Sequence, residues 1–437
     1  MEITYRILEI INYIVIVIAS LGFLFQILFI LFIPLKPKKF PKAKKLHRFA
    51  IIIPAHNEEV VIKNTVTNLL NNQTYPRDKY DVFVCADNCS DNTFKAAKEA
   101  GAITIFRNES DPSKKRAAYP IKKLVDLLMS NEYKGKYDAL IKFDADNTCN
   151  REFIEKMNDA LDSGVEIARC FEASSNATQN IWTKVSACYY IRDSRICSNF
   201  RERTKMNSML SGAGMMVAMS VFEDIGSWDA LSATDDSEFA VRRMLEDRKI
   251  HYVAEAVVYE DQPSTLKDTM NRLGRMGHAI HEMFWKIYWK LLPRSIQKFK
   301  FTYFDMFYQL LFIPIAILAT FWFPAYYIYY IIIHFLQGYC GVDIFTAFIS
   351  MEESRALIIN LLWYILYVLG GLSAVYIIET FFAVLLSKEQ TKIKNLKGYW
   401  LGILLSPIFM LVWDIAIVWG ILTNPGWKSI KRNIKNN

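Results

Sequence analysis

One long apolar run near the N-terminus limits what this chain can fold into more than any other feature. From Ile10 to Pro34 the sequence is almost continuously apolar, and about 20 such residues in a helix are enough to cross a bilayer. The apolar core of a cleaved signal peptide is shorter and ends at a small-residue cleavage site. We therefore predict that residues 1–35 contain a transmembrane helix.

A basic segment follows this run directly, at residues 36–48, and indicates its orientation. Its basic residues are Lys36, Lys38, Lys39, Lys42, Lys44, Lys45 and Arg48. Lys and Arg beside a span mark the cytoplasmic side and attract anionic lipid headgroups. We expect the N-terminus outside and the central domain in the cytoplasm of a cell-membrane protein.

A second basic group ends the chain, in residues 425–437, and the net charge is +8. Its members are Lys428, Lys431, Arg432 and Lys435. A strongly basic chain can also bind nucleic acid. Because the positive charge here lies at the borders of apolar runs, we assign it to membrane lipids and expect no nucleic-acid partner.

The central part of the chain has the mixed composition of a globular domain and alternates between two hydrophobic patterns. Short β-branched apolar runs predict buried strands at 49–54, 80–86, 102–106 and 139–143. Helical spacing predicts helices at 58–70, 91–100 and 114–129. This order predicts a mostly parallel sheet covered by helices on both faces, which binds ligands at the carboxyl ends of its strands.

Downstream, residues 283–300 mix aromatic residues and lysines at helical spacing, as in a helix that lies in the membrane interface. Further apolar runs lie at 303–321, 325–336, 357–386 and 399–422. We predict about four spans in residues 301–424, which places the basic tail in the cytoplasm.

The charges of the last loop disagree with four spans. Four spans would place Lys388, Lys392, Lys394 and Lys397 outside, whereas Lys and Arg beside a span normally lie on the cytoplasmic side. A re-entrant last segment, with breaks at Pro407 and Asp414, or an external tail would remove the disagreement.

Four short polar groups stand where a parallel sheet would place a pocket. They are residues 54–59 (Pro-Ala-His-Asn-Glu-Glu), 87–93 (Asp-Asn-Cys-Ser-Asp-Asn-Thr), 144–146 (Asp-Ala-Asp) and 234–236 (Thr-Asp-Asp). Each has a structural alternative, because polar residues after a strand are good helix caps worth about 1 kcal/mol. Capping is the strongest alternative for Glu59 and Asp91.

Asp144 and Asp146 favour a metal site. Residues two apart in extended backbone point to the same side, where two carboxylates repel each other unless a cation separates them. Mg²⁺ is commonly held by one or two carboxylates together with substrate phosphates. The pair alone is weak evidence, since it also arises by chance.

The order and spacing of the four groups resemble the family 2 glycosyltransferases with the GT-A fold. The resemblance is to the membrane enzymes grouped with cellulose, hyaluronan and poly-N-acetylglucosamine synthases and with ceramide glucosyltransferase. It implies a cytosolic α/β GT-A domain, Rossmann-like, at residues 49–282, with α-helical transmembrane segments on either side.

The resemblance also implies a role for each group. Asp144 and Asp146 would hold Mg²⁺ or Mn²⁺, and Asp236 would be the catalytic base. The nucleotide-sugar would contact Pro54, Ala55, Asn57, Glu59, Asp87, Lys114, Asp144, Arg272 and Arg275. The acceptor side would consist of Gly212, Ala213, Gly214, Asp235 and Met276.

Several residues depart from the family pattern. Arg272 replaces a glutamine, and Met276 replaces a tryptophan that lies beside the acceptor in polymerising members. Ser113 stands in place of a glycine before Lys114, and Asp235 replaces a glutamate. Arg272 and Arg275 could instead form a solvated helix face, since they are three residues apart.

From these features we expect a metal-dependent, inverting family 2 glycosyltransferase that transfers a hexosyl or N-acetylhexosaminyl group. Its donor would be a UDP-sugar and its acceptor a lipid or lipid-linked glycan at the cytoplasmic membrane face. One alternative is a processive synthase that extends and exports a β-linked polymer. Another is an inactive transferase-like scaffold, and other membrane subunits are possible partners.

Overall fold

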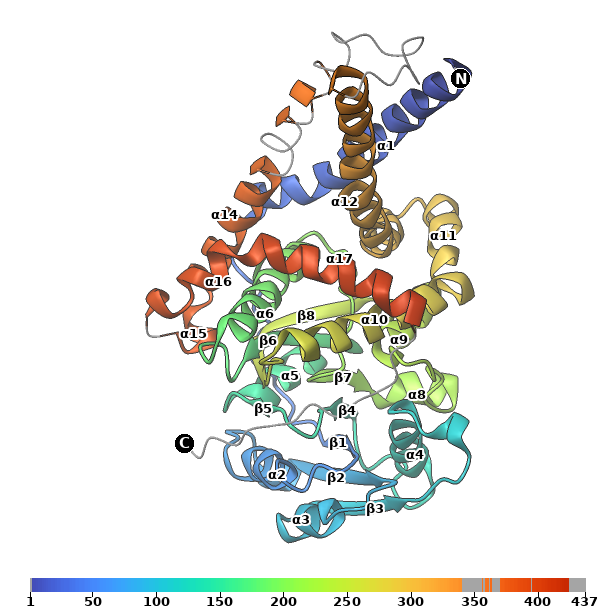
Figure 1. Ribbon diagram of the computed structural model, residues 1–437. Coiled ribbons are helices and arrows are strands. Elements are labelled where there is room, and N and C mark those ends of the chain that lie inside the picture. The colour runs from blue at the N-terminus through green and yellow to red at the C-terminus, as the bar shows by residue number, and fades with distance from the viewer. Residues whose placement is uncertain are drawn as a thin grey trace.

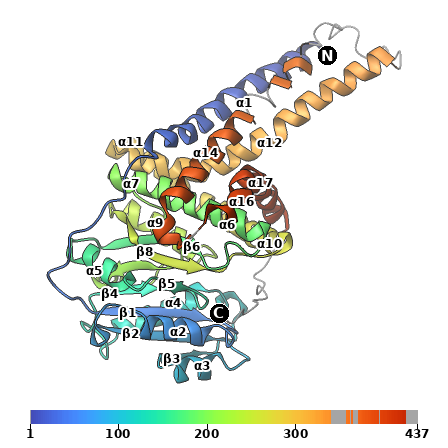
Figure 2. The same cartoon turned by 90° about the vertical axis from the view of Figure 1, so that its left-hand side faces the viewer.

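The computed structural model describes residues 2–339, 356, 358–360, 362–363, 370–393 and 395–423. An α/β domain forms one part of the molecule, and three long helices project from it (Figure 1). These are α1 (Glu2–Leu28), α12 (Phe301–Tyr339) and α14 (Gly370–Leu386). Figure 2 shows α1 and α12 side by side, and their apolar side chains pack together around Val15, Ala19 and Phe323.

A sheet of eight strands organises the domain, in the order β3-β2-β1-β4-β7-β6-β8-β5. The strands are β1 (Phe49–Ala55), β2 (Tyr80–Asp87), β3 (Ile103–Arg107), β4 (Ala139–Lys142), β5 (Thr148–Cys149), β6 (Ile167–Ser174), β7 (Met215–Ala218) and β8 (Ile250–Glu260). The first four strands were predicted from the sequence, and β3, β2, β1 and β4 are parallel as expected.

The prediction of a mostly parallel sheet holds only in part, because the sheet is mixed; β6 and β8 are also parallel, but β5 and β7 run the other way. β7 is antiparallel to both β4 and β6, and β5 is antiparallel to β8. The reason lies in the loop before β7, where the Gly214 N–H donates a hydrogen bond to the Lys142 carbonyl at 2.8 Å. The chain therefore enters β7 at the carboxyl end of β4 and runs back along it. This reversal brings residues 211–214 beside Asp144.

Helices cover both faces of the sheet, as predicted. They are α2 (Ile62–Asn71), α3 (Thr93–Glu99), α4 (Ala118–Met129), α5 (Phe153–Asp162), α6 (Ile181–Arg192), α7 (Asn199–Arg203), α8 (Met219–Ile225), α9 (Asp235–Leu245), α10 (Leu266–Lys286) and α11 (Leu291–Lys298). Alternate residues of β1 face opposite sides. Ile52 packs in a core with Leu124 and Trp228, and Ile53 packs in a second core with Val66 and Phe143.

Helices α2, α3 and α4 begin two to four residues later than predicted. The polar residues before α2 and α3 are held in loops by their own hydrogen bonds. The Glu58 N–H, for example, donates to Thr93 Oγ1 at 2.7 Å. Before α4, Asp111 accepts from the Ser113 N–H and caps the short 3₁₀ turn Pro112–Lys114. Side-chain hydrogen bonds of this kind compete with the first helical turn.

The C-terminal helices differ from four separate spans. The predicted runs 303–321 and 325–336 form one continuous helix, α12, since Pro324 between them does not end it and no polar segment separates them. The run 357–386 lies partly outside the described residues and includes α14. The run 399–422 divides at Leu405 into α16 (Trp400–Leu404) and α17 (Ser406–Thr423), and α17 continues through both Pro407 and Asp414.

Among the described residues, two helical segments are long and apolar enough to cross a membrane, Arg6–Phe32 and Ser406–Thr423. Buried ion pairs join the projecting helices to the α/β domain. Arg192 of α6 pairs with Glu379 of α14 at 2.7 Å, and Arg201 of α7 pairs with Asp305 of α12 at 2.8 Å. Separating either pair would leave a charge buried without its partner, which is costly. These contacts therefore fix the helices on the domain.

Candidate active site

The loops after β1 and β2 are tied to each other at the carboxyl edge of the sheet. His56 Nδ1 lies 2.6 Å from the Asp87 carbonyl, and the Ser90 N–H donates to Asn57 Oδ1 at 2.8 Å. Asn57 has a left-handed backbone, with φ of 55°, which asparagine adopts more readily than most residues. Asp87 is buried and pairs with Arg107 of β3 at 2.5 Å. Asp87 is thus oriented before any ligand arrives.

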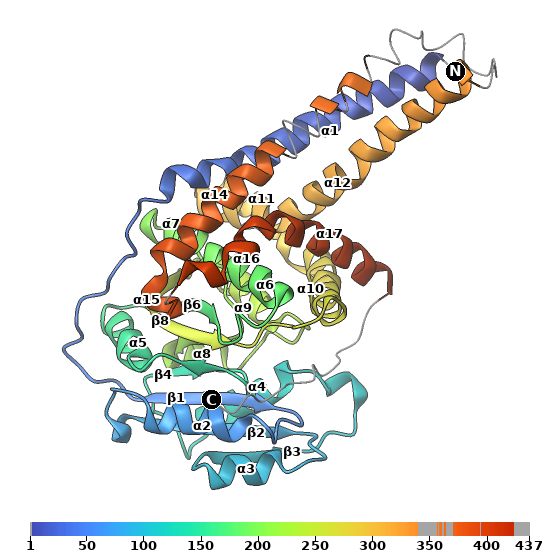
Figure 3. The same cartoon turned by 60° about the vertical axis from the view of Figure 1, so that its left-hand side comes forward.

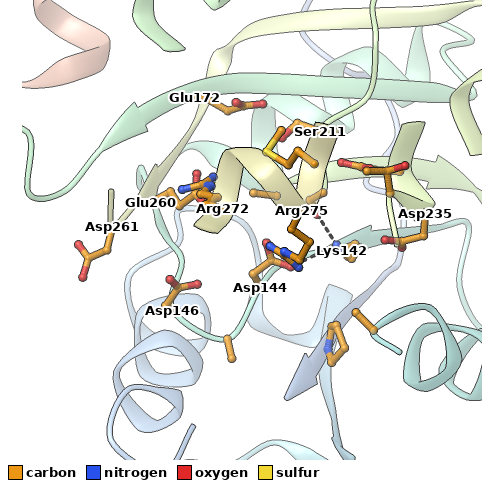
Figure 4. A pocket seen from close by; sticks show the side chains of 18 of the residues that line it. Lys142, Asp144, Asp146, Glu172, Ser211, Asp235, Glu260, Asp261, Arg272 and Arg275 are labelled. Carbon is orange, nitrogen blue, oxygen red and sulfur yellow. Dashed lines mark hydrogen bonds and ion pairs between the residues drawn. The ribbon is translucent and has the colours of Figure 1, made fainter. Parts of the chain in front are cut away.

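The carboxylates of residues 144–146 follow β4, whose last residue is a buried lysine. Lys142 Nζ donates to Asp144 Oδ1 at 3.1 Å and to the Gly212 carbonyl at 2.8 Å (Figure 4). Lys142 is two residues before Asp144, so the two side chains emerge on the same side of the chain. A buried cation, the Lys142 ammonium, therefore lies directly beside the Asp144 carboxylate.

The first turn of α9 brings Asp235 and Asp236 to the same place. A Cβ atom on Gly212 would lie 2.9 Å from Lys142 Nζ, 3.5 Å from Asp236 Oδ2 and 3.9 Å from Asp144 Oδ2. A side chain at Gly212 would displace Lys142 Nζ, because three functional groups converge on this position. Two groups separated by about 90 residues of chain are thus neighbours in the folded domain.

Helix α10 contributes two arginines. Arg272 Nη2 pairs with Glu260 Oε1 at 2.8 Å, and its guanidinium lies 5.6 Å from the centre of the Tyr190 ring. Arg275 points toward Asp144 (Figure 4). No hydrogen bond or ion pair joins Arg275 to another described residue. Neither arginine belongs to a solvated helix face.

These residues line one cavity of about 1960 Å³. Its wall includes Pro54 and Asp87, a central group of carboxylates formed by Asp144, Asp235 and Asp236, and Leu310 of α12 and Trp413 of α17. Twelve of the residues singled out from the sequence line it: Pro54, Ala55, Asp87, Asp144, Asp146, Gly212, Ala213, Asp235, Asp236, Arg272, Arg275 and Met276. The fold therefore unites groups that lie far apart in the sequence.

Residues 47–279 match the family model described as "Glycosyltransferase like family 2", over more than half of the chain. The chain belongs to glycosyltransferase family 2. The resemblance inferred from the four polar groups is thus confirmed, and the protein is a transferase that acts on sugar donors.

Two relatives illustrate the range of this family. The "Probable glycosyltransferase YdaM" of Bacillus subtilis (strain 168) is 23% identical over 415 residues, covering 91% of this chain and 88% of that protein. The "Beta-monoglucosyldiacylglycerol synthase" of Trichormus variabilis is 23% identical over 253 residues, or 56% of this chain. This second match spans only 51% of the Trichormus protein.

A solved structure supports the fold over nearly the whole chain. The mannosyltransferase of Pyrobaculum calidifontis, in complex with GDP-Man and Mn²⁺, superimposes with a TM-score of 0.54 at 13% identity. The match covers 96% of this chain and 100% of that one. The α/β domain of this family 2 glycosyltransferase is therefore a mixed-sheet, Rossmann-like GT-A fold.

Electrostatics make the central group suited to a cation. Burial is the main reason that the pKa of Asp235 is raised to about 7; Lys142 opposes this shift and Asp236 adds to it. Burial also raises the pKa of Asp236, again against Lys142. Burial alone would lower the pKa of Lys142, but Asp144, Asp235 and Asp236 together raise it. Three carboxylates thus lie around Lys142, and Arg275 is a second cation close enough to act on them.

The residues present fit a divalent metal ion bound together with substrate. Asp235 Oδ2 is buried and has no hydrogen-bond partner among the described residues. Asp144 and Asp146 offer the oxygen ligands that Mg²⁺ and Mn²⁺ accept. In the described part of the chain no three His, Cys, Asp or Glu side chains are already grouped to hold a metal. Phosphate oxygens and water would have to supply the other ligands.

Four residues of the predicted site do not line the cavity: Asn57, Glu59, Lys114 and Gly214. Glu59 Oε2 accepts from the Asn92 N–H at 2.9 Å, so the capping alternative describes it better. Lys114 lies 3.6 Å from Asp111 and is half-exposed. A Cβ on Gly214 would come within 2.6 Å of Cys170 Sγ, so this glycine serves packing.

Sequence reasoning missed several residues that line the cavity. Lys142, Glu260 and Tyr190 are among them, as are Lys115 and Arg116 next to the predicted Lys114. Lys142 could have been predicted, because it is two residues before Asp144 and side chains two apart in a strand point to the same side. The others come from elements whose place beside the site depends on the fold.

Proposed function

We propose that this family 2 glycosyltransferase transfers a hexosyl or N-acetylhexosaminyl group from a UDP-sugar to a lipid or lipid-linked glycan, with inversion. The observation that carries the proposal is the cavity itself. It joins Asp87 and Asp144 at one end to Met276, Leu310 and Trp413 at the other. One cavity can therefore hold a nucleotide-sugar and an acceptor whose apolar part extends toward the projecting helices.

The donor would lie along the carboxyl edge of the sheet. Asp87, held by Arg107, would accept hydrogen bonds from the nucleoside, with Pro54 and Ala55 beside it. Asp144 and Asp146 would hold Mg²⁺ or Mn²⁺ against the diphosphate. When bound, the metal supplies positive charge that offsets the charge developing on the leaving UDP. The GDP-Man and Mn²⁺ of the Pyrobaculum complex support this combination.

Asp236 would act as general base at the centre of the cavity. Its carboxylate would take the proton of an acceptor hydroxyl as the oxygen attacks the anomeric carbon. The raised pKa of Asp236 makes it a stronger base than an exposed carboxylate. Arg275 would face the diphosphate, since its fork of donors suits phosphate oxygens. A single displacement of this kind inverts the anomeric centre.

We place the enzyme on the cytoplasmic side of the cell membrane as a multi-pass protein. The exposed apolar surface of α1 and α12, including Leu21, Leu24, Phe304 and Ile328, supports this placement. The name of the Trichormus relative, a monoglucosyldiacylglycerol synthase, supports a lipid acceptor. Other membrane subunits would find the same apolar helices available for contact.

The test is product analysis from membranes supplied with a panel of radiolabelled UDP-sugars. We expect one sugar to enter a lipid-extractable product only when Mg²⁺ or Mn²⁺ is present. An Asp236→Asn variant should lose this product. Asp229→Asn is the matched control, because Asp229 pairs with Arg243 and does not line the cavity.

A polymer that survives lipid extraction would favour a processive synthase instead. One observation favours that candidate: Tyr189, Tyr190 and Trp413 place aromatic rings in the cavity wall, and aromatic faces stack well on sugar rings. Unchanged UDP release in Asp236→Asn would contradict the assigned base. The absence of both product and UDP release in the unsubstituted protein would favour an inactive scaffold.

A further inference from the structure

The last apolar helix, α17, lies along the catalytic domain. It runs beside α10 (Figures 1 and 3), and the two backbones touch. A Cβ on Gly420 would come within 2.0 Å of the Gly274 carbonyl oxygen, and one on Gly277 within 2.8 Å of Ile417 Cα. Only glycine permits such an approach. The two helices are therefore in direct contact, without a lipid layer between them.

This contact extends over most of α17. Near its start, the rings of Phe409 and Trp413 lie 5.7 and 4.8 Å from Tyr189 of α6. Ala416 and Ile417 are buried further along. Because α10 carries Arg272 and Arg275 into a polar cavity, α10 cannot lie in the hydrocarbon of a bilayer. A helix packed along it lies at the same level.

The opposite face of α16 and α17 is apolar and exposed. Its exposed residues are Trp400, Leu401, Leu404, Ile408, Leu411, Ile415 and Leu422. They recur at helical spacing, so the two helices together have one face toward the domain and one face without a protein partner in the described structure. Both helices lie between the domain and the projecting helices (Figure 1).

The segment before α16 is held on the catalytic domain. The Tyr259 hydroxyl donates to the Gln390 carbonyl at 3.0 Å, and Lys392 Nζ lies 4.4 Å from the centre of the Tyr259 ring. Tyr399 is buried in a core with Phe171 and Tyr252. The basic residues of this loop are therefore on the same side of the membrane as the domain.

We infer that α16 and α17 do not cross the membrane but lie flat on its cytoplasmic surface, with their exposed apolar face in an anionic lipid layer. Basic residues flank the pair on both sides, with Lys388, Lys392 and Lys397 before it and the basic group of residues 425–437 after it. Anionic headgroups attract such charges. The exposed Trp285 and Trp289, next to Lys286 and Lys290, extend the same kind of surface.

This placement removes the disagreement between the charges and the number of spans. With α1, α12 and α14 as the crossing helices, the basic loop and the basic tail are both cytoplasmic. Trp413 is on the domain face of α17 and lines the cavity, so the helix also forms the cavity wall nearest the lipid. The inference rests on helix contacts and does not require the proposed reaction.

The experiment compares the two ends of α17 in the full-length protein. Single cysteines at Lys397→Cys and Asn437→Cys are treated with a membrane-impermeant maleimide on intact and permeabilised cells, with the unsubstituted protein as background. We expect both to react only after permeabilisation. Labelling of the two positions from opposite sides, or of both from outside, would overturn the inference.

A depth measurement checks the same point without relying on sidedness. A nitroxide attached at Leu411→Cys, on the exposed face of α17, is compared with one at Leu24→Cys in α1; both leucines are exposed. We expect the label at Leu411 to collide with a water-soluble nickel chelate at least severalfold more often than the label at Leu24. Equal, low accessibility at both positions would refute a flat helix.

Discussion

The two ends of the cavity are built in different ways. The end at which we propose that the donor binds, the donor end, is formed by loops that directly follow β1, β2 and β4, and its residues come in short sequence groups. The end proposed for the acceptor, the acceptor end, is formed by α6, α10, α12 and α17, which are far apart in the chain. The charged groups at the donor end thus come from a few short loops. At the acceptor end, a single substitution in one helix can change the shape of the cavity without changing those loops.

Electrostatics separate the ends as well. Around Asp144, Asp235 and Asp236 three carboxylates lie close to two cations, Lys142 and Arg275, an arrangement that suits a metal and a diphosphate. Away from this group, toward the acceptor end, buried charges are paired, as in Arg169 with Glu172 at 2.9 Å. Paired charges bind neutral polar groups such as sugar hydroxyls without a large desolvation cost. Loss of charge should therefore matter most at the donor end and at the centre.

The largest effect is expected at the centre, where the two ends meet. Asp236→Asn should lower the turnover rate by about 10²–10⁴-fold, the usual contribution of a general base. The dissociation constant for UDP should change little, because the substitution keeps the shape of the side chain. Turnover by product mass spectrometry and UDP binding by calorimetry test this. A large loss of UDP affinity with normal turnover would instead assign Asp236 to the donor end.

Removal of the buried cation should have the next largest effect. Lys142→Met removes the buried cation from beside Asp144, Asp235 and Asp236, and losing one partner of a buried ion pair costs about 3–5 kcal/mol of unfolding free energy. Because Mn²⁺ with UDP brings positive charge to the same carboxylates, the pair should restore part of the lost thermal stability. Thermal unfolding with and without Mn²⁺ and UDP measures this. An equal loss in Lys122→Met, whose lysine is half-exposed, would contradict a special role for Lys142.

The raised pKa of Asp235 predicts a pH dependence for the metal-free protein. Its pKa is about 7 in the folded state and lower when unfolded, so the folded state holds the proton more tightly. The carboxyl therefore favours the folded state less and less as the pH rises from about 4 to 7. Asp235→Asn should flatten this part of the stability profile. Chemical unfolding of the two proteins at several pH values compares the slopes, and identical slopes would refute the shift.

A smaller effect is expected at the acceptor end. Tyr190→Leu removes a ring that lines the cavity and should raise the KM for the acceptor about 3–10-fold, since aromatic packing contributes about 0.5–1.5 kcal/mol. The KM for the UDP-sugar should stay unchanged. Tyr190→Phe keeps the ring and is the matched control. A parallel rise of both KM values would show that the two ends are not independent.

The smallest effect is expected at Glu59, which the family pattern assigned to the donor. Because Glu59 caps the Asn92 N–H and does not line the cavity, Glu59→Gln should cost at most about 1 kcal/mol of stability. The KM for the donor should change less than about threefold. A tenfold rise in that KM, at unchanged stability, would return Glu59 to the donor site.

Much of the donor half could be predicted from the sequence. Apolar β-branched runs identified β1 to β4, and the polar residues after them, such as Asp87 and Asp144, were correctly expected at one edge of the sheet. The start of each helix was less accurate, because capping side chains such as Asp111 hold the chain in a loop. The antiparallel β7 was missed, since its direction depends on a hydrogen bond between Gly214 and Lys142.

The sequence by itself determined the N-terminal apolar helix, strands β1 to β4 and the four polar groups that identify the family. These features depend on neighbouring residues, so their periodicity and spacing are visible in one dimension. The tertiary structure alone decided that Asp236 meets Asp144 at Gly212, that Lys142 stands between them, and that α17 packs on α10. Each of these contacts joins residues far apart in the chain, and only the complete packing of sheet and helices brings them together.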